Sequence, residues 1–325
     1  MKKIRVAVVG AGQFGKHHMR VIRESERAEL AAVVDQDPAR AAEAASAYGC
    51  PCFTDFRQLA GLVDAAVVAV PTVKHAEVGC PLLEAGIDLL VEKPIAADLD
   101  SARRLVDTAE AHGRILQVGH LERFNPAVAA LREIVDAPLF FEIHRLSVFT
   151  PRSLDVDVVL DLMIHDLDIV LSLVKAEPEE IRAAGISILS SKVDIANVRV
   201  AFPRGVVANF TASRVSTERV RKLRLFQPHQ YISVDYGKQE TTVLSVTPQR
   251  SIAFQPVVVN KAEPLRLEIE AFLDAVCNRS RPVVDGEDAT RALRVAIAIL
   301  DKIEEHSRVV AQSVASLRKL ERPQR

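Results

Sequence analysis

Ionisable side chains interrupt one strongly apolar stretch of the chain, Asp157–Val174 (DVVLDLMIHDLDIVLSLV). They stand four, four and three residues apart, as Asp157, Asp161, His165 and Asp168. On a regular helix this spacing forms one polar stripe, while the other faces are apolar and expected to be buried. Histidine and aspartate perform general acid–base chemistry near neutral pH, and buried charges need partners or such a task. The stripe alone fits either a catalytic surface or a wet helix edge neutralised by basic neighbours.

A glycine motif near the N-terminus predicts a phosphate-binding turn. The apolar run Ile4–Val9 is typical of a strand buried on both faces, and a helical pattern follows the motif GAGQFG. In this context the first glycine permits a tight turn, the second lets the backbone approach a diphosphate, and the third lets helix and strand pack closely. The helix N-terminus offers N–H groups and a positive dipole end to the phosphates. The predicted contacts are Gly10, Gly12, Gln13, Phe14 and Gly15.

A second apolar strand, Leu30–Val34, ends in Asp35, which lies 20 residues after Gly15. A carboxylate at this position is expected to accept hydrogen bonds from ribose hydroxyls and to repel a 2′-phosphate. The constellation therefore predicts NAD, rather than NADP, as the cofactor. A purely structural glycine turn would not account for the strand, the helix and the acidic residue together.

Strands and helices continue to alternate as far as residue 120. This rhythm predicts a doubly wound parallel sheet, an α/β Rossmann domain over residues 1–120, with ligands outside the carboxyl ends of its strands. Residues at those strand ends are expected to line the cofactor and substrate crevice. They are Pro71, Thr72, His75, Glu92, Lys93 and His120. The two histidines are equally well explained as structural residues.

Residues 121–306 show short strand patterns separated by turns. They predict an α+β domain for substrate binding and oligomerisation, with a large, mainly antiparallel open sheet and the helix 157–174 inserted early. The predicted strands are 139–149, 181–189, 195–202, 206–212, 220–226, 231–236 and 240–246. Helices are expected at 126–135, 265–278 and 288–306. The basic tail 307–325 is expected to be solvated.

The 325 residues are enough for two domains, with 49% hydrophobic residues and a net charge of -1. This balance argues against nucleic acid as a partner. No apolar run approaches the roughly 20 residues that span a bilayer, so no membrane segment is expected. The few, scattered cysteines favour free thiols in a reducing cytoplasm and predict neither a disulfide nor a metal site. They are Cys50, Cys52, Cys80 and Cys277.

Several motifs together resemble the glucose-fructose oxidoreductase/inositol dehydrogenase/MocA (Gfo/Idh/MocA) family. They are GAGQFG at 10–15, VPTVKH at 70–75, EKP at 92–94, RFNP at 123–126 and DLMIHDLD at 161–168. EKP followed by DxxxHxxD is far more specific than the glycine motif. The likeness spans most of the chain and is weakest after about residue 240. It implies an NAD-dependent dehydrogenase of sugars or polyols.

The resemblance implies that Lys93, Asp161 and His165 form the catalytic set, with a Lys93-Pro94 bond that is often cis in the family. Oxidation of an alcohol needs a base for the hydroxyl proton while hydride leaves the same carbon. We expect His165 to be that base, Lys93 to stabilise the developing alkoxide, and Asp161 to orient one of them. In a rival division of roles, a desolvated Lys93 is the base.

Within the family, GHLERFNPAV and LDLMIHDLDIVL most resemble the UDP-N-acetylglucosamine 3-dehydrogenases. This likeness implies oxidation of the sugar at C3 to a 3-keto product, which a sugar aminotransferase would use in lipid A or surface polysaccharide assembly. Substrate contacts are expected from His120, Arg123, Asn125, Arg152 and Asp168, with Arg145 and Arg214 as further candidates for the diphosphate. Many relatives carry glycines where this chain has Asp155–Val159. UDP-N-acetylglucosaminuronic acid and a cyclitol or free sugar are therefore alternative substrates.

An NAD-binding sensor without turnover is the alternative of another class. It gives no chemical reason to retain Lys93 and His165 together. Sheet faces in this family commonly pack against a second subunit, so the resemblance also implies a homodimer or homotetramer.

Overall fold

A computed structural model describes residues 3–150 and 156–320, with side chains as far as residue 311. Contacts within the chain divide it into two compact units. Unit 1 comprises Met1–Asn125 and Ala262–Leu293, and unit 2 comprises Pro126–Lys261 and Arg294–Arg325. The returning segment 262–293 is thus grouped with the N-terminal half, whereas the sequence pattern grouped it with residues 121–306.

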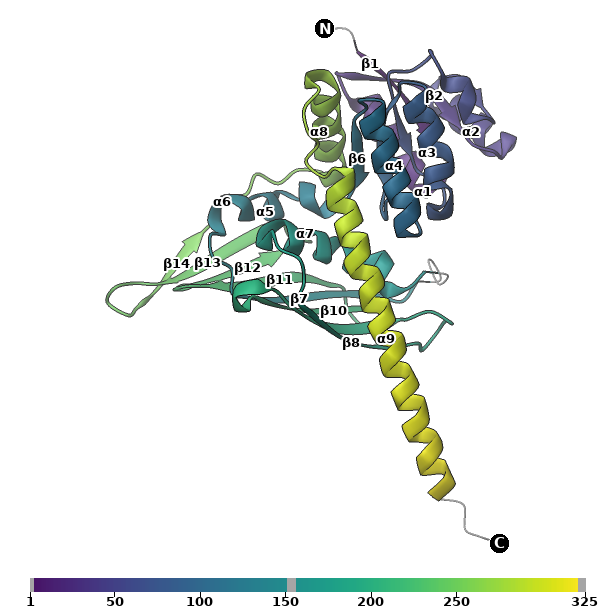
Figure 1. The fold of residues 1–325 in the computed structure, drawn as a ribbon. Helices are drawn as coiled ribbons and strands as arrows, with labels where there is room; N and C mark the ends of the chain where they lie inside the picture. The colour runs from purple at the N-terminus through teal and green to yellow at the C-terminus, as the bar shows by residue number, and fades with distance from the viewer. Residues whose placement is uncertain (1–2, 151–155, 321–325) are drawn as a thin grey trace. The chain divides into compact units, whose positions relative to one another are not determined.

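Unit 1 contains a six-stranded parallel sheet in the order β3-β2-β1-β4-β5-β6 (Figure 1). The order reverses between β1 and β4, which is the switch point where such sheets bind ligands. Its strands are β1 Ile4–Val9, β2 Ala28–Val34, β3 Cys52–Phe53, β4 Ala65–Val68, β5 Asp88–Glu92 and β6 Leu116–Gly119. The central strand β4 is buried along its whole length, as an uninterrupted apolar run predicts.

Helices pack against this sheet and complete the Rossmann architecture (Figure 1). They are α1 Gln13–Glu24, α2 Pro38–Tyr48, α3 His75–Glu84, α4 Leu99–Ala111 and α8 Pro264–Asn278. The last of these returns from much later in the chain and buries Ile269, Phe272 and Leu273 in the same core as Val6 and Val8 of β1. Burial of three large apolar side chains, at about 1.5–3 kcal/mol each, explains why α8 belongs to unit 1.

Unit 2 contains an eight-stranded sheet in the order β14-β13-β12-β11-β7-β10-β9-β8. All neighbours are antiparallel except β7 and β10, which are parallel. The strands are β7 Phe140–Val148, β8 Glu180–Ile186, β9 Ile195–Ala201, β10 Val207–Ser216, β11 Val220–Gln227, β12 Gln230–Asp235, β13 Glu240–Val246 and β14 Ile252–Pro256. The predicted open, mainly antiparallel sheet is confirmed, although β14 and the two-residue β3 were not predicted.

Helices of unit 2 lie against one face of this sheet (Figure 1). They include α5 Pro126–Ala129, α6 Leu131–Ile134 and α7 Ile164–Val174. Alternate residues of β7, namely Phe141, Ile143 and Arg145, are buried on one side of the strand. This alternation is the period of two that a sheet with one covered face requires.

Three helices differ from the sequence prediction. The expected helix 126–135 is divided into the short helices α5 and α6. The expected regular helix 157–174 instead contains a π-helical turn, Val159–Met163, before α7 begins at Ile164. The last helix, α9, runs from Gly286 to Leu320 and so continues through much of the segment predicted as a solvated tail. In the part of the chain that the structure describes, no helix combines the length and apolarity needed to cross a membrane.

Candidate active site

The glycine loop joins β1 to α1, and the fold itself requires two of its glycines. Gly10 has φ +105°, a conformation that residues with a Cβ rarely adopt. A Cβ on Gly15 would lie 1.8 Å from the carbonyl oxygen of Gly10, so only glycine permits this approach of α1 to the end of β1. The predicted turn at Gly10 and close packing at Gly15 are confirmed.

The remaining glycine of the motif leaves the loop backbone open. A Cβ on Gly12 would meet no heavy atom of the described structure within 4 Å. Among the described side chains none caps α1 at Gly12, and the first turn of the helix holds no acidic residue. The start of α1 therefore presents main-chain N–H groups and the positive end of the helix dipole to an anion. This cradle fits the diphosphate of a dinucleotide.

Asp35, at the end of β2, is 8% exposed and is fixed by three donors. Its Oδ2 accepts from the Ala11 main-chain N–H at 2.9 Å. Its Oδ1 accepts from the Asp37 N–H at 2.9 Å and from Nη2 of Arg40 at 3.0 Å. The carboxylate is thereby held beside the glycine loop, where a ribose is expected to bind.

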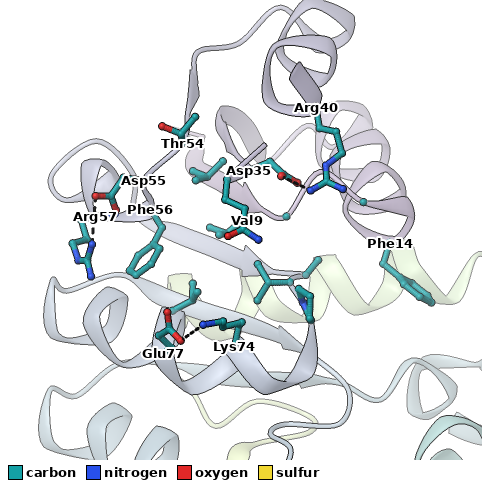
Figure 2. A pocket seen from close by; sticks show the side chains of 18 of the residues that line it. Val9, Phe14, Asp35, Arg40, Thr54, Asp55, Phe56, Arg57, Lys74 and Glu77 are labelled. Atoms are coloured by element: carbon teal, nitrogen blue, oxygen red, sulfur yellow. Dashed lines mark hydrogen bonds and ion pairs between the residues drawn. The ribbon is translucent and has the colours of Figure 1, made fainter. Parts of the chain in front are cut away.

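A cavity of about 690 Å³ opens beside this loop, and its walls come from unit 1 (Figure 2). Six predicted cofactor residues line it: Gly10, Gly12, Gln13, Phe14, Asp35 and Pro71. The other lining residues include seven that sequence reasoning missed: Arg40, Thr54, Asp55, Phe56, Arg57, Lys74 and Glu77. Figure 2 shows the Asp35–Arg40 pair on one side of the cavity and the Lys74–Glu77 pair on the other. The volume of the cavity is typical of a pocket that binds a small-molecule ligand.

The missed segment Thr54–Arg57 follows β3, so the strand-end rule would have found it had that strand been recognised. A two-residue strand has no measurable periodicity, which explains the omission. Of the predicted cofactor contacts, Gly15, Thr72, His75, Glu92 and Lys93 do not line this cavity.

The end of β5 carries Glu92 and Lys93, followed by a cis Lys93-Pro94 bond as the resemblance implies. Oε1 of Glu92 accepts from Nε2 of His18 on α1 at 2.7 Å, and Oε2 accepts from the main-chain N–H of Lys93 at 3.2 Å. The partly buried Glu92 carboxylate therefore ties the first residues after β5 to the helix of the glycine loop.

His75 requires a correction. Its side chain is 1% exposed, with Nδ1 3.0 Å from the Pro94 carbonyl oxygen and Nε2 3.0 Å from that of Val70. Burial lowers the pKa of His75, so the neutral ring donates to one carbonyl at a time. Its side chain links two strand-end loops, and we revise the predicted cofactor contact to a supporting role.

His120 is buried close enough to Lys93 and Arg123 to feel both charges. Burial lowers its pKa to about 3, the positive charges of Arg123 and Lys93 add to the effect, and Glu92 and Asp288 oppose it. The imidazole is therefore neutral at physiological pH. This position beside Lys93 is compatible with the predicted contact with substrate.

Two predicted substrate residues are instead part of the interior of unit 1. Arg123 is 6% exposed and donates from Nη2 to the Val283 carbonyl at 3.2 Å and to Asp288 at 3.3 Å. Asn125 is 3% exposed and donates from Nδ2 to Glu122 at 3.2 Å. Both side chains hold the segment after β6 in place, so we revise their predicted roles. Arg152, also predicted to bind substrate, lies outside the described residues.

In unit 2, Asp161 and His165 are both partly exposed at the junction of the π-helical turn and α7. Such turns are rare and are frequent at functional sites. Asp168 is 2% exposed and Asp157 accepts from the Val193 N–H at 2.8 Å. The four residues therefore do not form one open stripe, because Asp168 is buried and the partly exposed Asp157 is bound to the Val193 main chain. Asp161 and His165 are the partly exposed pair nearest the π-helical turn.

Sequence reasoning missed Asp166, because it falls outside the polar stripe. Asp166 is 1% exposed and accepts from Nε and Nη2 of Arg145 at 2.7 and 2.8 Å. Arg145 is therefore a buried anchor for α7, not a diphosphate ligand. Arg214 is likewise buried, donates to the Val156 carbonyl and lies 3.7 Å from Asp194.

Comparisons with known proteins agree with this architecture. Residues 4–120 match "Oxidoreductase family, NAD-binding Rossmann fold" and residues 137–229 match "GFO/IDH/MocA C-terminal domain". The chain is 36% identical to UDP-N-acetylglucosamine 3-dehydrogenase from Acidithiobacillus ferrooxidans, over 94% of the chain and 98% of that protein. A solved structure of that enzyme superposes with a TM-score of 0.89 at 35% identity, covering 94% and 99% of the two chains.

A more distant relative acts on a different kind of molecule. Inositol 2-dehydrogenase from Rhizobium meliloti is 26% identical over 94% of this chain and 98% of its own length. The glycine cradle, the Asp35 carboxylate and the matching families together establish the cofactor as NAD. The chain belongs to the Gfo/Idh/MocA family and is an NAD-dependent oxidoreductase with a Rossmann domain followed by the family's C-terminal domain.

Proposed function

We propose that this enzyme oxidises the C3 hydroxyl of UDP-N-acetylglucosamine to a 3-keto sugar. The observation that carries the proposal is the 36% identity, over 94% of the chain, to a UDP-N-acetylglucosamine 3-dehydrogenase. The product ketone is a substrate for a sugar aminotransferase, as used in lipid A or surface polysaccharide assembly. All four cysteines are free thiols, which supports a cytoplasmic location for the reaction.

The cradle residues would hold the cofactor by its diphosphate and adenosine ribose, through the N–H groups after Gly12 and the carboxylate of Asp35. When bound, NAD supplies a hydride acceptor. His120, neutral beside Lys93, offers a substrate hydroxyl a hydrogen-bond partner without adding charge.

The chain's own chemistry is proton transfer and charge stabilisation. We propose that His165 takes the hydroxyl proton, that Lys93 stabilises the negative charge that develops on the same oxygen, and that Asp161 orients the base. In the rival division Lys93 is the base. The partial exposure of Asp161 and His165 supports their access to substrate, whereas buried Asp168 is a supporting residue of α7.

Substrate choice is tested by following NADH formation with UDP-N-acetylglucosamine, UDP-N-acetylglucosaminuronic acid and inositol. Each assay should be repeated with glutamate and a sugar aminotransferase, because removal of the ketone product draws an unfavourable equilibrium towards oxidation. Turnover with UDP-N-acetylglucosamine supports the proposal. Turnover with inositol alone would favour the cyclitol alternative, which the similarity to inositol 2-dehydrogenase motivates. Tight NAD binding without turnover on any sugar would favour the sensor.

The division of roles is tested with Lys93→Met and His165→Asn. If His165 is the base, His165→Asn lowers kcat by about 10²–10⁴-fold, and Lys93→Met lowers it as well because charge stabilisation is lost. His144→Asn, on the opposite face of β7 from Arg145, is the matched histidine control. Near-native kcat in His165→Asn, with none in Lys93→Met, would assign the base to Lys93.

A further inference from the structure

A buried group of polar side chains surrounds Glu92 in unit 1, and the proposed mechanism does not use it. Glu92 accepts from His18 through Oε1 and from the Lys93 main chain through Oε2. His18 is 1% exposed and sits on α1, one turn past the glycine loop. A Cβ on Gly119, at the end of β6, would lie 3.3 Å from Oε2 of Glu92. The carboxylate thus lies among α1, β5 and β6, with its side chain 16% exposed.

A second carboxyl group, Glu268 on α8, lies in the same interior and is 1% exposed. The Glu268 main-chain carbonyl accepts from Nε2 of Gln117 on β6 at 3.1 Å. Within the described residues, neither Oε1 of Glu268 nor Oε1 of Gln117 has a hydrogen-bond partner. A charged carboxylate with an unsatisfied oxygen is costly in such a place, whereas a protonated carboxyl adds a donor where an acceptor is unused.

The surroundings of the two carboxyl groups shift their pKa values in opposite directions. Burial, and then the charge of Glu92, raises the pKa of Glu268 well above its usual value. Burial also acts to raise the pKa of Glu92, but the hydrogen bond from His18 and the charges of His18 and Lys93 outweigh it and bring that pKa below its usual value. His75 and His120 also face Glu92, and both are neutral because burial lowers the pKa of each. Two neighbouring carboxyl groups whose pKa values differ in this way carry one negative charge between them.

We propose that Glu268 is a neutral carboxylic acid and that Glu268 and His18 are positioning residues for Lys93. His18 holds the Glu92 carboxylate against the main-chain N–H of Lys93, which fixes the residue from which the ammonium projects. Neutral Glu268 leaves Glu92 as the only anion of this group, so the carboxylate stays between His18 and Lys93. The role for Lys93 rests on the proposed function, whereas the protonation state of Glu268 does not.

Infrared spectroscopy of the enzyme without substrate tests the state of Glu268. The wild type should show the C=O stretch of a protonated carboxylic acid at neutral pH, shifted in D2O and absent from Glu268→Gln. Asp274→Asn is the matched control, because it removes a carboxylate of the same helix that is 58% exposed and should leave the band in place. If the wild type and Glu268→Gln have the same spectrum in this region, Glu268 is ionised and the proposal fails.

Kinetics test the positioning of Lys93. His18→Leu should lower kcat about tenfold or more, because small misplacements of a reacting group have effects of this size, with KM for NAD changed less than about threefold. His18→Gln keeps a donor to Glu92 and should restore most of kcat. His17→Leu, an exposed neighbour on α1, should match the wild type. Equal kcat in His18→Leu and His17→Leu would leave His18 a purely structural role and overturn the proposal. If the wild type turns over no sugar, the proposed function fails and the infrared result stands alone.

Discussion

Asp35 and Arg40 form an oppositely charged pair at the mouth of the cofactor cavity. Asp35 is nearly buried and held by main-chain donors, whereas the Arg40 side chain is 53% exposed. The carboxylate disfavours a 2′-phosphate, and the guanidinium beside it would attract one. The preference for NAD over NADP therefore depends on the fixed negative charge of Asp35, which outweighs the exposed positive charge of Arg40.

Asp35→Ser should shift the cofactor preference from NAD towards NADP. Without the carboxylate, Nη2 of Arg40 loses its partner at 3.0 Å and becomes available to a 2′-phosphate, while the ribose hydroxyls lose an acceptor. We expect kcat/KM for NAD to fall by about 10–100-fold and that for NADP to rise, since a charge-assisted hydrogen bond contributes roughly 1.5–3 kcal/mol. The control Asp35→Ser/Arg40→Ala should lose the gain with NADP, and a gain that survives the second substitution would contradict this role of Arg40.

His120 makes the stability of unit 1 dependent on pH. Its pKa falls from 6.5 to about 3 on folding, so the unfolded chain binds more protons between these values and stability is lost as the pH drops below 6.5. Acidification from pH 7 to pH 5 should cost about 2 kcal/mol through this residue alone. Urea unfolding of His120→Asn at both pH values should show a correspondingly smaller loss. Exposed His112→Asn is the control, and an equal loss in both variants would contradict the assignment.

At the scale of elements, a buried ion pair fixes α7 to β7. The side chains of Arg145 and Asp166 are each 2% exposed, and the Arg145 guanidinium also lies 5.2 Å from the centre of the Tyr236 ring. Removal of one partner leaves the other charge buried without compensation, whereas replacement of both by apolar groups removes the problem. Because Asp166 follows His165 directly, this pair sets the rotation of α7 that presents His165.

Arg145→Met should destabilise unit 2 by about 3–5 kcal/mol, measured by urea unfolding. Arg145→Met/Asp166→Leu should recover more than half of that loss. The pair Arg224–Glu142 joins β11 to the opposite face of β7 with both side chains 38% exposed, and Arg224→Met should cost under about 1 kcal/mol. Similar losses of unfolding free energy in Arg145→Met and Arg224→Met would show that burial does not determine how much the Arg145–Asp166 pair stabilises unit 2.

The local sequence patterns predict most of these helices and strands, but not the hydrogen-bond partners of their buried side chains. Buried strands and the glycine turn follow from hydrophobicity and residue type, and the predicted Ile4–Val9 agrees with β1 at both ends. Asp166 and His75 were misjudged because their partners, Arg145 and the carbonyl of Pro94, are 21 and 19 residues away in sequence. The π-helical turn also has no signature in a pattern that assumes 3.6 residues per turn. A site is therefore easier to locate from sequence than to assign residue by residue.

At the scale of the molecule, the two-domain α/β and α+β architecture was predicted, but the return of α8 to unit 1 was not. The apolar positions Ile269, Phe272 and Leu273 show that α8 buries one face. The local sequence does not specify which of the two sheets this face packs against. The inference about Glu268 depends on this return, because only the folded chain brings Glu268 and Glu92 into one interior. Long-range placement of amphipathic helices is what a single sequence leaves undetermined.

The face of the unit 2 sheet opposite α7 carries a row of apolar side chains, and we propose that it packs against a second copy of the chain. Strand pairing aligns Phe140, Phe226, Tyr231, Leu244 and Phe254 across five strands. The Phe140 and Phe226 rings lie 5.9 Å apart and the Phe226 and Tyr231 rings 5.1 Å apart. Phe254 is 63% exposed in the single chain. An apolar row of this length on an open sheet is typical of a subunit interface.

Sedimentation tests this surface. The wild type should sediment at micromolar concentration as a species larger than the 35.6 kDa chain. Phe226→Glu should shift the enzyme towards the single chain, because a charge at the centre of an apolar interface is left without a partner. Arg103→Glu, at an exposed position of α4, is the control and should sediment as the wild type does. A wild type that sediments only as the single chain would reject the proposal.

The different surroundings of the three loop glycines have an evolutionary consequence. Gly15 is constrained by the Gly10 carbonyl 1.8 Å from its missing Cβ, so any descendant of this chain that still folds must keep it, whatever it binds. Gly12 faces open space and is constrained only by a ligand that approaches the backbone. In a lineage that no longer binds a dinucleotide, position 12 would therefore be substituted first, while glycine would be retained at position 15. Across natural variants, the ratio of change at these two sites would distinguish retired copies from working enzymes without any assay.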